Sequence, residues 1–428
     1  MRPHKLTIRT YQVGFGDCFL LSFDYGEDGE RHVLMDFGST SLPPGAPKNR
    51  MVEVARDIAE RSGGKLTAVV ATHRHKDHIS GFATSRDGDG SGDIIRELQP
   101  DLVLQPWTED PELDPKATGP RTPERDRVAA LGDMHQIAGF ALGDAKAMRD
   151  WDSIPRAMRQ ELEFLGDDNL SNRSAVENLM TMGPNAYLNT GADSGLAELL
   201  PGVETVVLGP PTVDQTATVL KQRSRDDNEF WHLRRLAAAG ERDEGRCAEA
   251  TLFDSKYVAR REPPFPEDAR WLIFKAQRMR GQQLLGIVRE LDKGLNNTSL
   301  ILLMKVGKKS LLFPGDAQIE NWTYALDQPE YRKMLKGVDL YKVGHHGSLN
   351  ATPKTLWELF EKKSPNPGPD RLRSLMSTMP GKHGSTERRT EVPRGTLEAA
   401  LRRDSELFST HEDLAPTALY SDIPFEFD

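Results

Sequence analysis

The chain has 428 residues, of which 37% are hydrophobic and 28% are charged, and its 65 acidic and 56 basic side chains give a net charge of −9. This composition is typical of a globular protein with a large core and excludes a disordered chain. The acidic balance also disfavours a protein that coats nucleic acid, because such proteins gain affinity by neutralising phosphates with Lys and Arg.

Membrane and disulfide signals are weak in this sequence. No run approaches the roughly 20 consecutive apolar residues of a membrane helix, and the N-terminus lacks the apolar stretch and cleavage site of a secretory signal. The two cysteines, Cys18 and Cys247, are too few for a disulfide framework and too far apart for a CxxC motif. We therefore expect a cytoplasmic protein with no membrane partner.

Strand patterns open the chain. Residues 5–13 alternate polar and apolar side chains, and residues 18–23 and 32–35 are short apolar runs separated by glycine-containing turns. Apolar residues then recur at helical spacing over 51–58, and this pattern stops at two glycines, 63–64, which suits a helix C-terminus. A further apolar run follows, so strands and helices alternate as in an α/β protein.

Two long segments interrupt the pattern. Residues 108–184 are rich in Pro, Asp and Glu, and residues 213–294 are dense in both signs of charge, and both have largely helical patterns. An apolar strand at 203–208 lies between them, and strand signals resume afterwards without a flexible linker. We therefore predict a single α/β domain over residues 1–428 with two largely helical insertions.

The last third of the chain again predicts strands. Residues 299–306 and 310–313 have the pattern of a hairpin that ends at Pro-Gly-Asp, 314–316. Residues 340–343 predict another strand, and a proline-initiated helix is expected from Thr352.

A cluster of histidines follows the apolar run at 66–71, in the order His73, His75, Asp77 and His78. Imidazole is the commonest metal ligand in proteins, and Asp adds a hard oxygen and a negative charge. Such a loop can also be a solvated turn, but three His and one Asp within six residues are improbable by chance among 11 His in 428 positions. Its spacing allows two ions, and ions about 3.5–4 Å apart are the geometry of two-metal hydrolysis.

These residues belong to a longer series that resembles the motifs of the metallo-β-lactamase-fold hydrolases. The series consists of Asp36 after a strand, the loop of residues 73–78, Asp316 in Pro-Gly-Asp and His345 after a later strand. It is similar in particular to the β-lactamase-like domain attached to bacterial competence (DNA-uptake) channel proteins. That likeness includes Val-Gly-x-Gly-Asp at 13–17, Asn-Asn-x-Ser-Leu at 296–300 and Lys-x-Gly-His-His-Gly-Ser at 342–348, and it covers residues 5–107, about 203–211 and 295 to about 401.

The resemblance implies a four-layer αββα sandwich with the metals at one edge, between the two sheets. It also implies a set of metal ligands: His73 and His75 for the first ion, Asp77 and His78 for the second, Asp316 as the bridge, and His345 completing the second site. Asp36 would accept a hydrogen bond from a ligand histidine and so orient it. A turn-capping Asp is the alternative interpretation of Asp36.

The sequence departs from the broad family at one ligand. Most members have a further His for the first metal between the HxHxDH loop and the bridging Asp, where this chain offers only His135 and His232. We interpret both as ordinary residues, and the competence-type relatives also lack this ligand. A first site with fewer protein ligands favours manganese or magnesium alongside zinc, because those ions keep water and oxygen ligands more readily.

Three further residues are candidates near the site. Adjacent residues of an extended loop point in opposite directions, so we expect His345 to bind metal, and we place His346 with Asp77 in the catalytic set, as a donor to a leaving group or phosphoryl oxygen. His383, on a glycine-flanked loop after a strand, is a candidate for substrate contact. Lys342 can offset phosphate charge. The alternatives are a solvated side chain for Lys342 and a packing role for His346.

The predicted function is metal-dependent hydrolysis by a hydroxide formed at neutral pH, because two divalent ions lower the pKa of a bound water toward about 7. The choice of a phosphodiester, in a nucleic acid or a small nucleotide, rests on the resemblance. Arginines and two tryptophans, Trp231 and Trp271, within 221–294 suit single-stranded nucleic acid, but interleaved acidic residues favour a solvated surface.

Three alternatives stay open. The same centre suits a thioester, lactone or other non-phosphate ester. Redox chemistry is a second alternative, although di-iron relatives add an acidic ligand to the loop that this chain lacks. The third is a metal-stabilised scaffold without turnover, which binds a protein partner through the inserted helices.

Overall fold

The structure is a computed structural model that describes residues 1–110, 119–120, 173–216, 296, 298–350, 352–382, 384 and 391–427. Within these ranges the chain is a mixed α/β protein with two mixed β-sheets, which confirms the predicted α/β class. His383, both tryptophans of the second segment and most of the two predicted insertions lie outside the described residues, as do His135 and His232. No helix of the described ranges is both long and apolar enough to cross a membrane.

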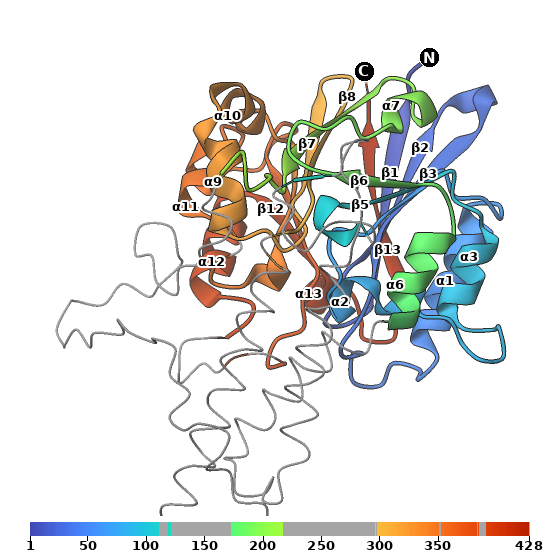
Figure 1. The fold of residues 1–428 in the computed structure, drawn as a ribbon. Helices are drawn as coiled ribbons and strands as arrows, with labels where there is room; N and C mark the ends of the chain where they lie inside the picture. The colour runs from blue at the N-terminus through green and yellow to red at the C-terminus, as the bar shows by residue number, and fades with distance from the viewer. Residues whose placement is uncertain are drawn as a thin grey trace, which may run out of the picture.

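The first sheet contains seven described strands in the order β13-β1-β2-β3-β4-β5-β6. Strands β13, β1, β2 and β3 pair antiparallel, whereas β3 to β6 run parallel to one another. The strands are β1 (Lys5–Tyr11), β2 (Cys18–Asp24), β3 (Glu30–Phe37), β4 (Ala68–Val70), β5 (Leu102–Pro106), β6 (Asn185–Leu188) and β13 (Tyr420–Glu426). The two ends of the described chain therefore lie side by side in one sheet (Figure 1).

The second sheet contains six described strands in the order β12-β11-β10-β9-β8-β7. Strands β7, β8 and β9 pair antiparallel, which confirms the predicted hairpin, and β9 to β12 are parallel. The strands are β7 (Val203–Gly209), β8 (Ile301–Val306), β9 (Lys309–Phe313), β10 (Leu340–Lys342), β11 (Arg373–Met376) and β12 (Glu406–Ser409).

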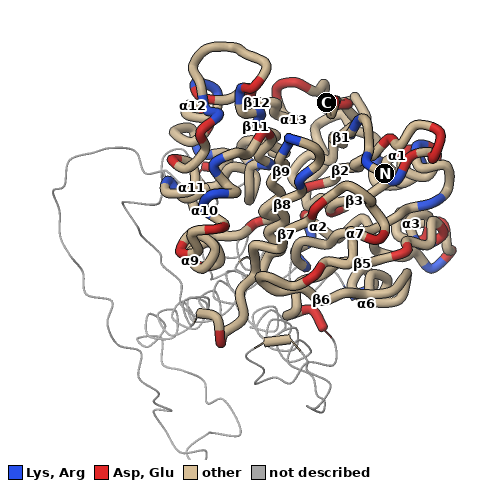
Figure 2. Tube along the Cα trace, turned by 90° about the horizontal axis from the view of Figure 1, so that it is seen from above, with Lys and Arg blue, Asp and Glu red and all other residues tan. Residues whose placement is uncertain are grey.

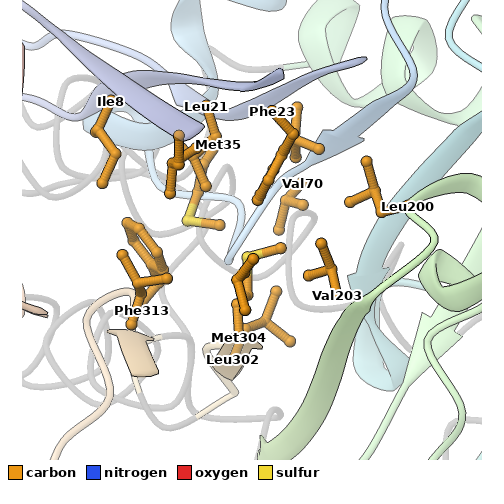
Figure 3. Close-up of a cluster of buried hydrophobic side chains, with 14 of the residues drawn as sticks. Ile8, Leu21, Phe23, Met35, Val70, Leu200, Val203, Leu302, Met304 and Phe313 are labelled. Carbon is orange, nitrogen blue, oxygen red and sulfur yellow. The ribbon is translucent and has the colours of Figure 1, made fainter. Parts of the chain in front are cut away.

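The two sheets share one hydrophobic core. Its side chains come from both sheets, for example Ile8 and Leu21 from the first and Leu302 and Phe313 from the second (Figure 3). Successive side chains of a strand point to opposite faces, so β8 contributes Leu302 to this shared core and Ile301 to the core on the other face. A strand covered on both faces reads as a continuous apolar run, as β8 does from Ile301 to Met304.

Helices cover the outer face of each sheet (Figure 1). On the first sheet lie α1 (Arg50–Arg61), α2 (Lys76–Ile79), α3 (Ser91–Glu97) and α6 (Arg173–Thr181); on the second lie α9 (Ile319–Asp327), α10 (Pro329–Lys336), α11 (Lys354–Leu359) and α12 (Gly395–Asp404). In α1 the predicted apolar face buries Val54 and Ile58, and the helix ends before Gly63. Two further short helices are α7 (Leu196–Leu199) and α13 (Thr410–Asp413).

Several elements differ from the sequence-based expectations. The helix expected from Thr352 begins at Lys354, because Pro353 is its N-cap rather than part of its first turn. Helix α6 falls within the segment 108–184 yet buries Ala175 and Leu179 against the first sheet. Strands β12 and β13 were not predicted. Their alternating patterns are too short to indicate strands by themselves, and the two segments become strands by pairing with β11 and β1.

The parallel strands determine where the site lies. Strands β3 and β4 of one sheet and β9 to β11 of the other each end in a loop that carries polar residues. The carboxyl ends of parallel strands meet at one edge of a sheet, which is where α/β proteins bind ligands. In Figure 1 the short helix α2, which follows β4, lies between the two groups of helices at this edge.

Candidate metal centre

Four buried side chains from distant parts of the chain form the centre: Asp77, His78, Asp316 and His346. Their ligand atoms all lie within 4.8 Å of one another. Asp77 and His78 are in α2 after β4, Asp316 follows β9, and His346 follows β10. Two carboxylates and two imidazoles in this arrangement suit a divalent cation.

Asp316 lies between two groups of histidines. Its Oδ1 is 3.1 Å from Nε2 of His78, whereas its Oδ2 is 4.0 Å from Nε2 of His73 and 3.9 Å from Nε2 of His345. His75 adjoins the second group, with its Nδ1 3.0 Å from Nε2 of His73. One carboxylate therefore faces both halves of the centre, the position that a bridging ligand requires.

Asp36 orients His78 through the ring nitrogen that faces away from Asp316. Its Oδ2 accepts hydrogen bonds of 2.8 Å from Nδ1 of His78 and from Oγ1 of Thr72, and its Oδ1 accepts one of 2.7 Å from the Thr72 backbone. With Nδ1 occupied, His78 presents Nε2 to Asp316, as metal-binding histidines with a carboxylate partner do. Asp36 thus makes the contact that the resemblance implies and also caps the turn at Thr72.

His346 is fully buried and fixed at both ring nitrogens. Its Nδ1 lies 2.9 Å from the carbonyl oxygen of Ser377, which can only accept, so Nδ1 is the donor. Its Nε2 lies 2.8 Å from Oδ2 of Asp77. The ring of Phe15 packs against the imidazole, with centroids 4.3 Å apart. This environment holds Nε2 toward the centre.

The backbone at His345 and His346 is not extended. Both residues have left-handed φ values, 44° and 51°, within a short 3-10 turn, and such conformations cost of order 1–3 kcal/mol each in a residue with a side chain. We expected an extended loop here, with the two side chains pointing in opposite directions. The loop is instead a tight turn, so that expectation is wrong. Both lie beside Asp316 or Asp77, and the backbone N–H of His345 donates to Oδ1 of Asp316 at 2.9 Å.

The electrostatics of the centre favour cations. Four carboxylates are buried here, against one buried ammonium, that of Lys342; they belong to Asp17, Asp36, Asp77 and Asp316. Burial disfavours the charged form of His78, but the carboxylates of Asp316 and Asp36 outweigh it and raise the pKa of His78 well above 6.5. Uncompensated buried charge is costly, so the centre gains stability from positive charge placed among these oxygens.

His73 and His75 have the opposite tendency. Burial lowers the pKa of His75 to about 4 and lowers the pKa of His73 well below its usual value. Neutral imidazole is the form that binds metal. These two rings are therefore in their ligand form at neutral pH.

Several buried polar atoms of the centre make no hydrogen bond to a protein group in the described part of the chain. Within the described ranges, Oδ2 of Asp316 is buried and makes no hydrogen bond. A buried acceptor without a donor is unfavourable and calls for an explanation such as an ion. The donor set and this oxygen fit a divalent metal.

Lys342 and Asp17 complete the centre. Lys342 is only 2% exposed and forms an ion pair with Asp17, so the solvated-Lys alternative is wrong. Asp17 ends the Val-Gly-x-Gly-Asp motif at 13–17, for which the resemblance implies no role. Ser377 was also missed, because it acts through a backbone carbonyl that no side-chain pattern reveals.

All described residues of the predicted site thus gather at one edge of the fold: His73, His75, Asp77, His78, Asp316, His345, His346, Asp36 and Lys342. Comparison with models of known protein families and with characterised protein sequences finds no match to this chain.

Proposed function

We propose that this chain is a metal-dependent hydrolase of the metallo-β-lactamase fold that acts on a phosphodiester. The support for the fold is the arrangement of two facing sheets with helices on both outer faces and the site at one edge. The order of the motifs along the chain agrees with it. The proposed ions are two divalent cations, zinc or manganese, with magnesium as a further candidate.

The observation that carries the proposal is the buried group of Asp77, His78, Asp316 and His346. Asp316 also faces His73, so the chain offers ligands on both sides of one carboxylate. When bound, a pair of divalent ions supplies hydroxide at neutral pH and stabilises charge on phosphoryl oxygens. The chain's own contribution is to hold the rings of His78 and His346 through Asp36 and Ser377, so that little reorganisation is needed at the moment of reaction.

The two adjacent histidines differ in access. The side chain of His345 is 28% exposed, whereas that of His346 is fully buried between Asp77 and Ser377. Burial and fixed geometry suit a metal ligand, and exposure suits a group that contacts substrate. We therefore assign His346 to the metal centre and His345 to the substrate side, the reverse of the assignment expected from the resemblance.

The negative charge of the site means that a phosphodiester would need the metal ions in order to bind. The buried carboxylates around Asp316 repel a phosphate, so affinity for the substrate must come from bound cations. Basic and acidic residues are interspersed along the described chain (Figure 2), rather than gathered as in proteins that coat nucleic acid. A substrate held mainly at the metal centre, such as a small nucleotide or a strand end, is favoured.

The test is hydrolysis by the purified full-length chain with Mn²⁺ or Zn²⁺, using single-stranded DNA, RNA, cyclic dinucleotides and bis-nitrophenyl phosphate. We expect cleavage that is lost on chelation, restored by metal, and abolished in Asp316→Ala and His75→Ala. Asp339→Asn, at the other end of β10, is the matched buried-aspartate control and should retain activity.

Cleavage of none of these substrates, or full activity in Asp316→Ala, would overturn the proposal. Turnover of a thioester or lactone alone would overturn only the substrate class. Metal binding without any turnover would favour the scaffold.

A further inference from the structure

Two sequence motifs that are far apart along the chain meet behind the metal centre. The loop at 13–17 connects β1 to β2, and Lys342 is the last residue of β10. Neither Asp17 nor Lys342 is among the proposed metal ligands. Their meeting point is the buried ion pair between Asp17 and Lys342.

The backbone of Asp17 is locked against the metal-binding loop. Its N–H donates to the carbonyl oxygen of Asp77 at 2.9 Å, and its own carbonyl accepts from the N–H of Gly38 at 3.0 Å. A Cβ at Gly38 would overlap the backbone of Asp77, and a Cβ at Gly16 would overlap the carbonyl oxygen of Gly38. Only glycine permits this close approach, so the position of Asp17 relative to Asp77 is tightly determined.

The same loop also contacts the second metal-binding segment. The hydroxyl of Ser377 donates to the carbonyl oxygen of Gly16, while the carbonyl of Ser377 accepts from Nδ1 of His346. Phe15 packs against the same imidazole. The loop at 13–17 therefore connects α2 in one half of the fold with the His346 turn in the other.

The carboxylate of Asp17 lies behind two ligand rings. Its oxygens are 3.7 Å from Nδ1 of His346 and 3.7 Å from Nδ1 of His78. In both rings the other nitrogen, Nε2, faces the proposed metal position through Asp77 or Asp316. Asp17 thus approaches each ring from the side opposite to the metal.

We propose that Asp17 and Lys342 are positioning residues that fix the rings of His78 and His346 for metal binding through a buried ion pair. This inference rests on the metal centre proposed above. Asp17, Asp36 and His78 by themselves have the geometry of a cation site, and the ammonium of Lys342 supplies the positive charge at that corner. Divalent ions are thereby directed to the Nε2 side, next to Asp316.

The proposed role requires both Asp17 and Lys342. Without Lys342, Asp17 adds an uncompensated carboxylate beside Asp36, and a divalent ion can bind on the wrong side of His78. Without Asp17, the buried ammonium of Lys342 repels incoming ions and loses its partner. Removing the charges of both Asp17 and Lys342 abolishes the misplaced ion binding and the repulsion of ions. Only the poorer orientation of the two histidine rings is then left.

The experiment compares Lys342→Met, Asp17→Asn and the double variant in the full-length chain, with Co²⁺ as the probe. The absorption spectrum of Co²⁺ reports ligand geometry, and titration gives its affinity. We expect each single variant to lose about 10–100-fold in affinity, as orienting residues around metals do, and to show an altered spectrum. The double variant should recover part of that affinity, and Lys342→Arg, which keeps the charge, should recover most of it.

Lys309→Met is the matched control, since it breaks a Lys–Asp ion pair with Asp339 at the other end of the same sheet. It should bind Co²⁺ and hydrolyse substrate as the wild type does. Wild-type Co²⁺ affinity and spectrum in both single variants would overturn the inference while leaving the proposed function intact. A wild-type protein that binds no Co²⁺ would instead overturn the metal centre itself.

If the single variants do not fold, the double variant and Lys342→Arg decide the question. A folded double variant with wild-type affinity and spectrum overturns the inference. A reduced affinity in that variant, with recovery in Lys342→Arg, supports it.

Discussion

Asp36 accepts a hydrogen bond of 2.8 Å from Nδ1 of His78, 42 positions further along the chain. Asp36 itself has a left-handed φ of 54° at the end of β3, and it binds Thr72 with both carboxylate oxygens. The contact joins the ends of two neighbouring parallel strands, β3 and β4. It fixes which nitrogen of His78 faces Asp316.

Replacing Asp36 by Asn should therefore weaken metal binding without removing a ligand. The amide keeps the size of the side chain but loses the charge that strengthens the bond to His78, so we expect a loss of about 10–100-fold in metal affinity. Metal titration followed by activity at saturating metal measures it. Unchanged affinity in Asp36→Asn would show that the contact is only a turn cap.

Removal of metal should lower the thermal stability of the protein. Ions bound among the buried carboxylates of Asp77 and Asp316 stabilise the folded state alone, by about 2.7 kcal/mol when the free metal is 100-fold above its Kd. A chelator should therefore lower the melting temperature of the wild type, and excess metal should restore it. Asp316→Ala should show a much smaller shift, and equal shifts in the two proteins would count against Asp316 as a ligand.

The two adjacent histidines should respond differently to substitution. His346→Ala removes a buried group beside Asp77, so we expect less bound metal per protein chain. His345→Ala should keep most of the metal and lower kcat by about 100-fold or more if His345 acts as a proton donor. The exposed His411 in α13 is the control for His→Ala. Metal loss in His345→Ala but not in His346→Ala would restore the assignment implied by the resemblance.

A histidine remote from the centre should make stability depend on pH. Burial lowers the pKa of His32 from 6.5 to about 4, and its Nδ1 lies 2.9 Å from Oγ of Ser22. The unfolded chain therefore takes up this proton first, so the folded state loses stability as the pH falls from about 6.5 to about 4. The loss should approach about 3 kcal/mol by linkage.

Denaturant unfolding of the wild type and of His32→Gln across this range measures the effect. The variant lacks the titrating group, so its free energy of unfolding should fall less steeply with acid. Parallel pH profiles in the two proteins would contradict the prediction.

The sequence alone was sufficient for much of the local structure. Continuous apolar runs predict β4 and β8 because strands buried on both faces need apolar side chains at every position. The spacing of Val54 and Ile58 predicts the buried face of α1. The loop from His73 to His78 predicts a metal centre because its ligands lie within six residues of one another.

Other features depend on contacts between distant segments, which no local pattern encodes. Strand β13 exists by pairing with β1, and α6 belongs to the core because it packs on the first sheet. The same holds for Lys342: its position in the sequence suggests a residue that offsets phosphate charge, and only the fold shows that it is buried and paired with Asp17.

The sequence by itself thus determined which residue types could bind metal and the apolar periodicity that places them at strand ends. Only the tertiary structure decided how these residues are used. Where β10 meets β11, His345 is left partly exposed, whereas His346 is buried and its ring binds the carbonyl oxygen of Ser377. Local spacing sets what a segment can form, whereas burial and partners are set by the segments packed against it.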